Sequence, residues 1–155
     1  MSSLLAALNG VLNASQPLPN LVTSGQPEPQ HLQALKEAGA ETVLDIRDPM
    51  EPRSFDEPEL VRSLGMDYVN VSVRHGALDD ALMETVLGVV RRNARRPMLF
   101  HCASANRVGG ALIPYFILDE GMTEEAAITA AMQVGLRSAD LLEWGLDYAR
   151  RKAGG

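Results

Sequence analysis

Cysteine is almost absent from this chain, since Cys102 is the only one among 155 residues. A single thiol excludes an internal disulfide framework and a zinc or iron–sulfur site made from several cysteines. No apolar run reaches the roughly 18 residues that cross a bilayer, so we expect no transmembrane segment. The amino terminus has no Lys or Arg ahead of its apolar stretch, which is unlike a secretory signal peptide. We therefore expect a protein of the reducing cytoplasm.

Basic residues are in the minority as well. The chain has 14 Lys and Arg against 20 Asp and Glu, which gives a formal net charge of −6 at pH 7. This acidic balance argues against a dedicated binder of nucleic acid or of an anionic membrane. The one local basic run, residues 91–96, has no aromatic side chains between its arginines and is typical of a solvated helix end. We expect neither nucleic acid nor a membrane as a partner.

The length and the apolar content of 46% are typical of a single globular domain. Apolar residues between positions 4 and 12 lie on one side of a predicted helix. We expect residues 1–20 to form this helix and a linker, and residues 21–152 to form the domain. The apolar helix face packs on the body of the protein or on a second copy, so a homodimer is an arrangement that the sequence allows.

Short apolar segments alternate with helical patterns along the rest of the chain. The strand candidates are residues 21–24, 42–46, 66–73 and 98–101, and the helix candidates are 29–38, 59–64, 79–93, 107–120, 124–134 and 139–152. This alternation predicts an α/β fold with a central, mostly parallel sheet of four or five strands, flanked by helices. Chemistry in such folds lies beyond the carboxyl ends of the strands, and Cys102 follows the last of them. The proline-rich, acidic segment 48–58 fits no regular element and is the length of loop that is often functional.

A loop of small residues carries Cys102 from this last strand into the helix that follows. Successive backbone N–H groups in such a loop can form a cradle for an anion, and the helix dipole adds positive potential there. Arg107 can close over a bound oxyanion with its bidentate fork, and the same charges favour a thiolate. We predict Cys102 as a nucleophile, with His101 tuning its thiol. The predicted anion-binding residues are Ala103, Ser104, Ala105, Asn106 and Arg107.

This arrangement resembles the His-Cys-…-Arg signature of the cysteine-dependent protein tyrosine and dual-specificity phosphatases. Four residues separate Cys102 from Arg107, one fewer than usual, as in a bacterial branch whose phosphatase-like domain is also found fused to β-lactamase-fold hydrolases. Residues 23–27, 43–47 and 64–68 resemble the same branch, so the resemblance covers roughly residues 20–150. It implies a dual-specificity-phosphatase-like fold and hydrolysis of a phosphate monoester through a phosphocysteine, without a metal or an organic cofactor. The expected partner is a phosphorylated protein or small molecule.

Two positions in the loop depart from the pattern of that family. Val108 stands where many active members have Ser or Thr directly after the Arg, to assist the leaving thiolate. Ala105 stands where the loop often has Gly, and a positive φ there would cost an alanine about 1 kcal/mol. Ser104 could supply the missing hydroxyl. The missing hydroxyl at Val108 predicts slow breakdown of a phosphocysteine.

The resemblance also implies a general acid on a neighbouring loop, which here corresponds to residues 74–80. We predict Asp79 as the acid, with Asp80 and His75 as the next candidates. Asp79 can equally serve as the amino-terminal cap of the helix that begins there. His75 has a side chain that ordinarily titrates near physiological pH. Asp45 and Asp48, at the end of an earlier strand, are third choices.

The sequence is compatible with two other functions. Rhodanese-like sulfurtransferases use a Cys-x4-Arg loop of the same length, and residues 43–49 look like their strand-Asp-x-Arg segment, so Cys102 could carry a persulfide. Against this, their segment after that Arg is missing here. The third possibility is a non-catalytic protein that binds phosphate or a phosphoprotein without turning it over, which Val108 and the uncertain acid permit.

Overall fold

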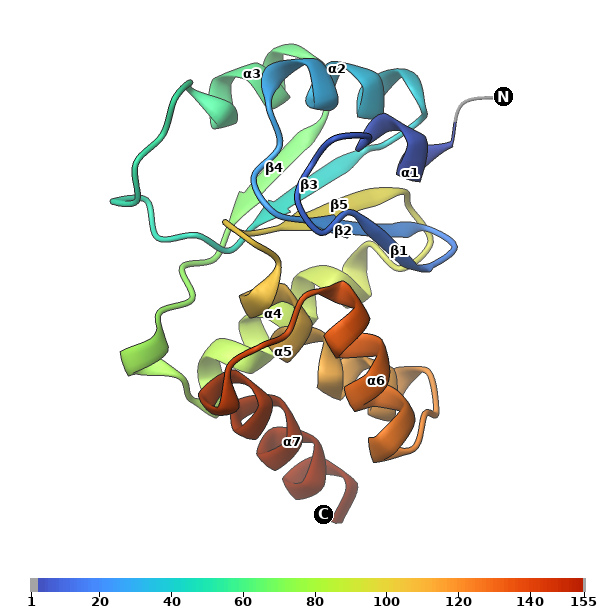
Figure 1. The fold of residues 1–155 in the computed structure, drawn as a ribbon, viewed down its shortest axis with the longest axis vertical. Helices are drawn as coiled ribbons and strands as arrows, with labels where there is room; N and C mark the ends of the chain where they lie inside the picture. Colours follow the sequence, from blue (N-terminus) through green and yellow to red (C-terminus); the bar gives the residue numbers. More distant parts are fainter. Residues whose placement is uncertain (1–2, 155) are drawn as a thin grey trace.

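A five-stranded sheet crosses the middle of the protein (Figure 1). The computed structural model describes residues 3–154. The strand order is β1-β2-β5-β3-β4. Neighbouring strands are parallel, except that β1 at one edge is antiparallel to β2. The strands are β1 Ser15–Leu18, β2 Leu21–Ser24, β3 Thr42–Asp45, β4 Asp67–Asn70 and β5 Met98–His101. The predicted α/β fold with a mostly parallel central sheet is confirmed.

Helices cover both faces of the sheet (Figure 1). One face carries α1 Leu4–Ala7, α2 Pro29–Glu37 and α3 Glu57–Ser63, and the other carries α4 Asp80–Arg92, α5 Asn106–Pro114, α6 Glu124–Val134 and α7 Ala139–Gly154. A 3-10 turn, His75–Ala77, precedes α4, and a π-helical turn, Tyr115–Asp119, continues α5. Within the described residues, no helix is both long and apolar enough to span a membrane.

The central strands are apolar because both of their faces are buried. Leu99 on β5 packs against α1 to α3, whereas its neighbours Met98 and Phe100 pack against the α4 to α7 side. Side chains alternate in this way along a strand, so a strand covered on both faces needs apolar residues at successive positions. The sheet therefore separates two hydrophobic cores, and a polar site is expected at the ends of the strands.

The amino-terminal segment differs from the helix and linker expected for residues 1–20. The helix α1 ends at Ala7, and part of the expected linker forms strand β1. Gly10 and Asn13 have positive φ angles of 90° and 54°, which helical backbone does not allow. Leu8 and Val11 still reach the core on the α1 to α3 side. The apolar face of this segment thus packs on the body of the same chain, and a homodimer stays a prediction.

Helix α5 lies under the sheet in close contact with α7. A Cβ atom at Gly145 would lie 2.5 Å from the carbonyl oxygen of Gly110, so the absence of side chains lets these two helices approach. Pro114 ends α5 because it has no N–H to donate to the preceding turn, and the chain continues in a wider π turn. This packing holds the amino terminus of α5 fixed below the carboxyl end of β5.

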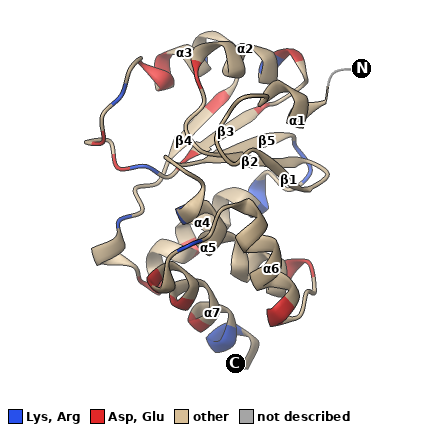
Figure 2. Cartoon of the chain, in the orientation of Figure 1, with Lys and Arg blue, Asp and Glu red and all other residues tan. Residues whose placement is uncertain are grey.

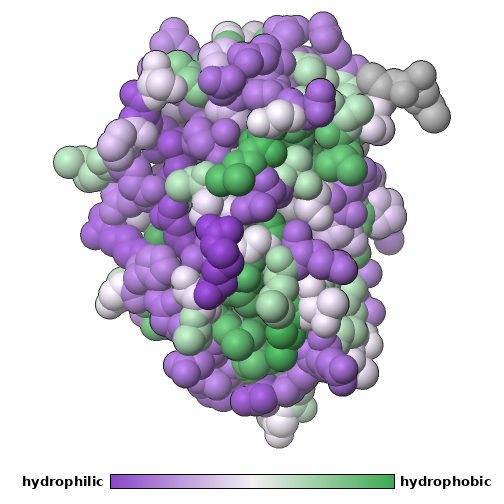
Figure 3. Space-filling model, in the orientation of Figure 1, coloured by the Kyte–Doolittle hydropathy of each residue, from purple (hydrophilic) through white to green (hydrophobic). Residues whose placement is uncertain are grey.

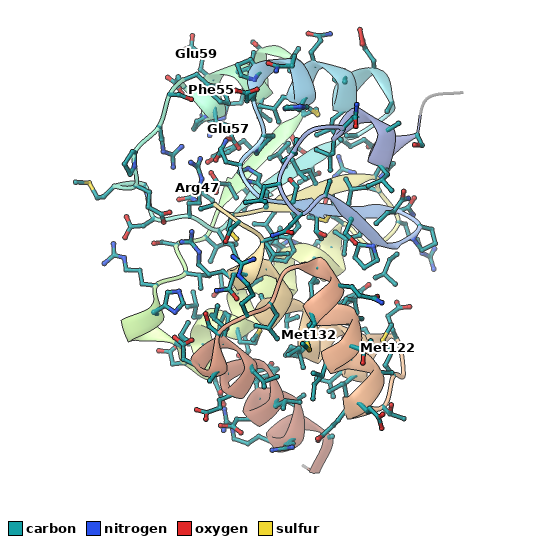
Figure 4. The ribbon with its side chains drawn as sticks, viewed as in Figure 1. Arg47, Phe55, Glu57, Glu59, Met122 and Met132 are labelled. Atoms are coloured by element: carbon teal, nitrogen blue, oxygen red, sulfur yellow. The ribbon has the colours of Figure 1, made fainter. Side chains whose placement is uncertain are left out.

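Hydrophilic and hydrophobic surfaces separate on the face shown in Figure 3. Polar side chains cover its left side, where the segment between β3 and α3 runs, and both acidic and basic residues lie along that segment in Figure 2. Hydrophobic side chains gather lower down near α6, whose Met132 is 63% exposed and is labelled in Figure 4. The charged segment lies at the carboxyl ends of the strands, the edge where the sequence predicts the site.

Candidate active site

Cys102 and Arg107 lie together at the carboxyl end of the central strand β5. Cys102 directly follows β5 and is only 1% exposed, while Arg107 is in the first turn of α5 with its side chain 12% exposed. The pKa of Arg107 is raised: burial opposes its charge, but hydrogen bonds to Glu51 and the negative charge of the Cys102 thiolate outweigh that penalty. The sulfur and the guanidinium are therefore close enough to act on one ligand.

The loop between them turns its backbone carbonyls outward. The amide N–H of Gln26 donates to the Ala103 carbonyl at 3.1 Å, and the Asn13 side chain donates to the Ser104 carbonyl at 2.8 Å. In a trans peptide the N–H of the next residue points opposite to the carbonyl. The N–H groups of Ser104 and Ala105 thus point away from these outer partners, into the loop. This is the orientation that a cradle for an oxyanion requires.

The backbone of the cysteine loop is strained at Ala105. Its φ of 70° and ψ of 4° lie in the left-handed region, which costs a residue with a Cβ about 1–2 kcal/mol. Gly135 lies directly against it, and a Cβ added there would be 3.0 Å from the Ala105 Cβ. The missing side chain at Gly135 makes room for the alanine methyl. The loop therefore keeps a glycine-like conformation without a glycine.

The outer rim of the loop is tied to the segment before α7. Arg137 donates to the Ser104 hydroxyl at 3.0 Å, and the Asn106 side chain donates to the Ser138 hydroxyl at 2.7 Å. The N–H of Arg137 donates in turn to the Asn106 side-chain oxygen at 2.7 Å. The Ser104 hydroxyl, which could have replaced the one missing at position 108, is thus engaged by Arg137.

A hollow of about 370 Å³ opens above Arg107. Its lining residues come from the β3–α3 segment, the segment after β4 and the cysteine loop; they are Glu51, Val73, Arg74, His75, Ser104, Asn106 and Arg107. Three of them are basic or can become so, in a chain that is acidic overall. Each of these three groups is paired with a carboxylate in the observed conformation: Arg74 with Asp48, His75 with Asp140 and Arg107 with Glu51.

Glu51 occupies the fork of Arg107. Its two carboxylate oxygens accept from the two terminal nitrogens of Arg107 at 2.8 and 3.0 Å, and the N–H of Asp48 donates to Glu51 at 2.6 Å. The pKa of Glu51 is lowered, mainly by the hydrogen bonds from Arg107 and against partial burial. A bound oxyanion must take at least one of these donors from Glu51. Together with the 1% exposure of Cys102, this contact closes the site in the observed conformation.

The three candidates for the general acid occupy different places. The Asp79 carboxylate accepts from the N–H of Leu82 at 2.8 Å and so caps α4, and Asp80 pairs with Arg151. His75 lines the hollow, and its Nδ1 lies 2.6 Å from Asp140. The hydrogen bond with His75 is the main cause that lowers the pKa of Asp140. Of the three, the structure places His75 beside Arg107.

Asp48, a third choice for the acid, is also committed to another contact. It pairs with Arg74, and its carboxylate accepts from the N–H of Met50 at 2.9 Å. The pKa of Asp48 is lowered, chiefly by the hydrogen bond from Met50. This carboxyl group therefore stays ionised at neutral pH, which is the wrong state for a proton donor.

A buried ionic network lies beneath the cysteine loop. Arg47 donates to Asp45 at 3.1 and 2.9 Å and to Glu57 at 3.4 Å, and the Tyr68 hydroxyl donates to Asp45 at 2.7 Å. His101 joins the network through Glu57, at 2.6 Å. The pKa of Asp45 is lowered: burial would raise it, but the Arg47 hydrogen bonds and the positive charge of His101 prevail. Figure 4 labels Arg47 and Glu57, which reach this network from the segment after β3 and from α3.

The same network contains three side chains of metal-ligating types. One donor atom from each of Asp45, Glu57 and His101 lies within 4.8 Å of the others. Both carboxylates, however, already accept from the Arg47 guanidinium, whose positive charge compensates theirs. The donor set is therefore neutralised from within the protein and does not suit a metal ion.

Comparison with known proteins finds likeness in structure rather than in sequence. No family model matches the chain, and no curated protein matches it. A candidate phosphatase (DUF442) from Shewanella putrefaciens superposes with a TM-score of 0.77 at 21% identity, covering 95% of this chain and 97% of that one. Pseudomonas aeruginosa TpbA gives 0.70 at 22%, covering 90% and 84%. The core catalytic domain of the PP-IP phosphatase SIW14 from Saccharomyces cerevisiae gives 0.71 at 17%, covering 92% and 91%.

The chain has the fold of the cysteine-dependent phosphatases. The expected dual-specificity-phosphatase-like architecture is thereby confirmed. The resemblance to the branch that is also found fused to β-lactamase-fold hydrolases stays a prediction. In this phosphatase fold, the carboxyl ends of β2, β5 and β3 meet at one edge of the sheet, where Cys102 and Arg107 lie.

Glu51 and Glu57 are the functional candidates that the sequence analysis did not single out. Both belong to the acidic, proline-rich segment at 48–58, which was expected to be a functional loop. Their separation from their partners is the reason they were missed: Glu51 meets Arg107 across 56 positions, and Glu57 meets His101 across 44. The only available signal was the acidic character of a long segment directly after a strand that ends near Cys102.

Proposed function

We propose that this protein is a cysteine-dependent phosphatase that hydrolyses a phosphate monoester through a phosphocysteine. The Cys102 thiolate attacks phosphorus, the P–O bond to the leaving group breaks, and the alcohol departs with a proton. Water then attacks the phosphocysteine, which releases inorganic phosphate and regenerates the thiolate. The observation that carries this proposal is the placement of Cys102 and Arg107 on one loop whose amides point inward at the start of α5.

The charges at the site suit the reaction. The inward N–H groups of Ser104 and Ala105 and the Arg107 fork are donors for the non-bridging phosphoryl oxygens. Such preorganised donors are the main source of rate enhancement in phosphoryl transfer. Each donor of this kind typically contributes about 10²–10³-fold to the rate. For the fork to act, Glu51 must yield at least one nitrogen of Arg107 to the substrate.

His75 is the proton donor that the geometry favours over Asp79. It lines the same hollow as Arg107, and Asp140 engages its Nδ1, so Nε2 is the ring nitrogen that would serve as the proton donor. Asp79 remains the prediction from family resemblance, although its carboxylate caps α4. Replacing the true acid lowers the rate by about 10²–10⁴-fold for alkyl phosphates and much less for aryl phosphates with good leaving groups. Comparing His75→Asn with Asp79→Asn on both substrate types identifies the residue.

The substrate is a phosphorylated molecule, either protein or small. Two similar structures point to compounds of this kind: TpbA was solved in complex with phosphotyrosine, and SIW14 is described as a PP-IP phosphatase. These are properties of those proteins. For this chain, a panel of phosphotyrosine peptides, phosphothreonine peptides and phosphorylated small metabolites, each assayed for phosphate release, assigns the class.

The decisive experiment compares wild type with Cys102→Ser on an aryl phosphate and on thiosulfate with cyanide. Phosphate release that depends on Cys102, with a phosphorylated cysteine trapped by rapid acid quench and mass spectrometry, supports the proposal. Thiocyanate formation that depends on Cys102 would show a sulfurtransferase instead. Phosphate release retained in Cys102→Ser excludes the thiolate mechanism.

A binding protein without turnover is the second candidate, and two observations favour it. Val108 offers no hydroxyl to the leaving thiolate, and Glu51 already occupies the Arg107 fork. In that case neither assay shows turnover, but inorganic phosphate raises the melting temperature of wild type and not of Arg107→Ala.

A further inference from the structure

Glu57 is a deeply buried carboxylate. It is 1% exposed and is the first residue of α3, where the helix dipole favours a negative charge. One of its oxygens accepts from the Gln26 side chain at 2.8 Å and from Arg47 at 3.4 Å, and the other accepts from His101 Nε2 at 2.6 Å. Glu59, one residue beyond Pro58 on the same helix, is exposed, and the two side chains are labelled in Figure 4. Only Glu57 reaches the elements that carry the site.

His101 is held between two acceptors. It is fully buried; its Nε2 faces the Glu57 carboxylate, and its Nδ1 lies 3.3 Å from the carbonyl oxygen of Cys102. A backbone carbonyl cannot donate a hydrogen, and the Glu57 carboxylate already accepts from Arg47 and Gln26. Each ring nitrogen therefore faces an acceptor, and the ring lies directly behind Cys102.

The contact with Nδ1 also sets the direction of one backbone amide. Because His101 holds the Cys102 carbonyl on its own side and the peptide is trans, the N–H of Ala103 points to the opposite side. That is the same inward direction as the N–H groups of Ser104 and Ala105. Three successive amides of the cysteine loop thus depend on outer partners, and for the first of them the partner is His101.

We infer that Glu57 is a positioning residue for the cysteine loop, which acts through His101 to hold a positive charge behind Cys102 and to turn the Ala103 amide inward. This inference rests on the proposed use of the same loop for phosphate. It assigns to Glu57 no contact with substrate, because Glu57 is buried beneath the loop. Its consequence is a thiolate that forms at lower pH than it would without the carboxylate.

Other charges act on the same groups and must be kept constant in any test. Strand β3 and the segment after it contribute two acids and two arginines, and α5 contributes one arginine. These groups are Asp45, Glu51, Arg47, Arg53 and Arg107. Among them, Arg47 also binds Glu57 directly, at 3.4 Å, so a substitution at Glu57 removes one partner of Arg47. A change in thiol titration on replacing Glu57 is therefore assigned to the Glu57–His101 pair only together with the double variant at His101.

The test is a titration of the thiolate by its ultraviolet absorbance, which needs no reagent to enter the closed site. Because Cys102 is the only cysteine, subtracting the Cys102→Ser spectrum isolates its signal. We expect Glu57→Gln to move the midpoint of this titration to higher pH by about one unit, equivalent to a tenfold change in proton affinity. Glu59→Gln, the same change on the exposed face of α3, leaves the midpoint in place. An unchanged midpoint in folded Glu57→Gln overturns the inference.

A double variant separates positioning from general structural support. In a His101→Asn background, Glu57→Gln should give no further shift of the midpoint, since the path through His101 is already broken. An equal shift in both backgrounds contradicts the inference. If Glu57→Gln does not fold, Glu57→Asp keeps the charge but is too short to reach His101, and the same upward shift is expected. Inorganic vanadate affinity provides a second readout and should fall about fivefold with the loss of one well-aligned amide.

The thiol titration does not require turnover. A shifted midpoint in a protein without phosphatase activity would leave this inference standing while the proposed function fails. Phosphatase activity in wild type, with no shift of the thiol midpoint in Glu57→Gln, would leave the proposed function standing and overturn the inference about Glu57.

Discussion

Arg47 and Arg107 follow two neighbouring parallel strands, β3 and β5, yet they are held in opposite ways. Arg47 is 4% exposed and its partners, Asp45 and Glu57, are buried as deeply as it is. The partner of Arg107 is Glu51, which is 30% exposed on the segment between β3 and α3. Removing one member of a buried ion pair typically costs about 3–5 kcal/mol, whereas an exposed pair is worth about 0–1 kcal/mol. Arg47 is therefore part of the scaffold, and Arg107 is free to exchange its partner for a ligand.

The comparison predicts that Arg47 contributes mainly to the stability of the fold. Replacing Arg47 with Met leaves Asp45 and Glu57 buried without a counter-charge, so the free energy of unfolding should fall by about 3–5 kcal/mol. Urea unfolding at neutral pH measures the loss. Arg53→Met is the matched control, because Arg53 is 21% exposed and its contact with Asp45 is long, at 4.0 Å. This variant should lose less than about 1 kcal/mol of the free energy of unfolding. Equal losses in the two variants would contradict the scaffold role.

Arg107 should show the reverse pattern. In Arg107→Lys the charge remains but the fork is lost, and we expect phosphatase activity on an aryl phosphate to fall by about 10²–10³-fold. The free energy of unfolding should change by no more than about 1 kcal/mol, since the pair with Glu51 is partly exposed. Steady-state kinetics and urea unfolding on the same preparation test both parts. Arg91→Lys on α4, whose partner is Asp119, is the control and should keep full activity.

Acid should weaken both pairs. The pKa values of Asp45 and Glu51 lie below their ordinary values of 3.8 and 4.5, so each carboxylate contributes stability above that ordinary value. The contribution is lost as the pH falls through the lower value of the folded state. The melting temperature should thus be nearly constant from pH 7 to about pH 5 and should decrease below about pH 4. A melting temperature that rises below pH 4 would be incompatible with these pairings.

Strain in the cysteine loop can be relieved without touching either arginine. Ala105→Gly removes the unfavourable left-handed alanine, which should raise the free energy of unfolding by about 1–2 kcal/mol. Part of this gain is lost because glycine makes the unfolded chain more flexible. We expect a net gain in the free energy of unfolding of at most about 1 kcal/mol. Gly135→Ala, which brings a methyl against Ala105, should instead be destabilising. Chemical denaturation of both variants gives the comparison, and a loss in Ala105→Gly would argue against strain at this position.

The smallest effect is expected at Glu51. Glu51→Gln weakens the hold on Arg107 by about 1 kcal/mol or less, so inorganic phosphate should bind up to about fivefold more tightly. The same change should speed alkylation of Cys102 by iodoacetamide, because the closed site opens more often. Isothermal titration and alkylation kinetics measure the two effects, with Glu59→Gln as the control. Weaker phosphate binding in Glu51→Gln would show that Glu51 orients the fork instead of competing for it.

Local signals in the sequence predicted most of the fold. The strands at 21–24, 42–46 and 98–101 were recognisable because their two buried faces demand continuous apolar residues. Strand β1 was missed because it contains Pro17 and polar residues, which only an edge strand tolerates. Helix α3 begins two residues earlier than expected, at Glu57, because Asp56 caps it.

The cysteine loop itself could be read from the chain, because Cys102, the small residues and Arg107 are contiguous and their geometry follows from a strand entering a helix. The partners of that loop could not. Glu51, Glu57 and His75 reach it from segments distant in sequence, and Asp79 caps a helix instead. A parallel sheet gathers the ends of strands that are far apart along the chain, so which carboxylate meets which cation is decided only when the sheet has formed.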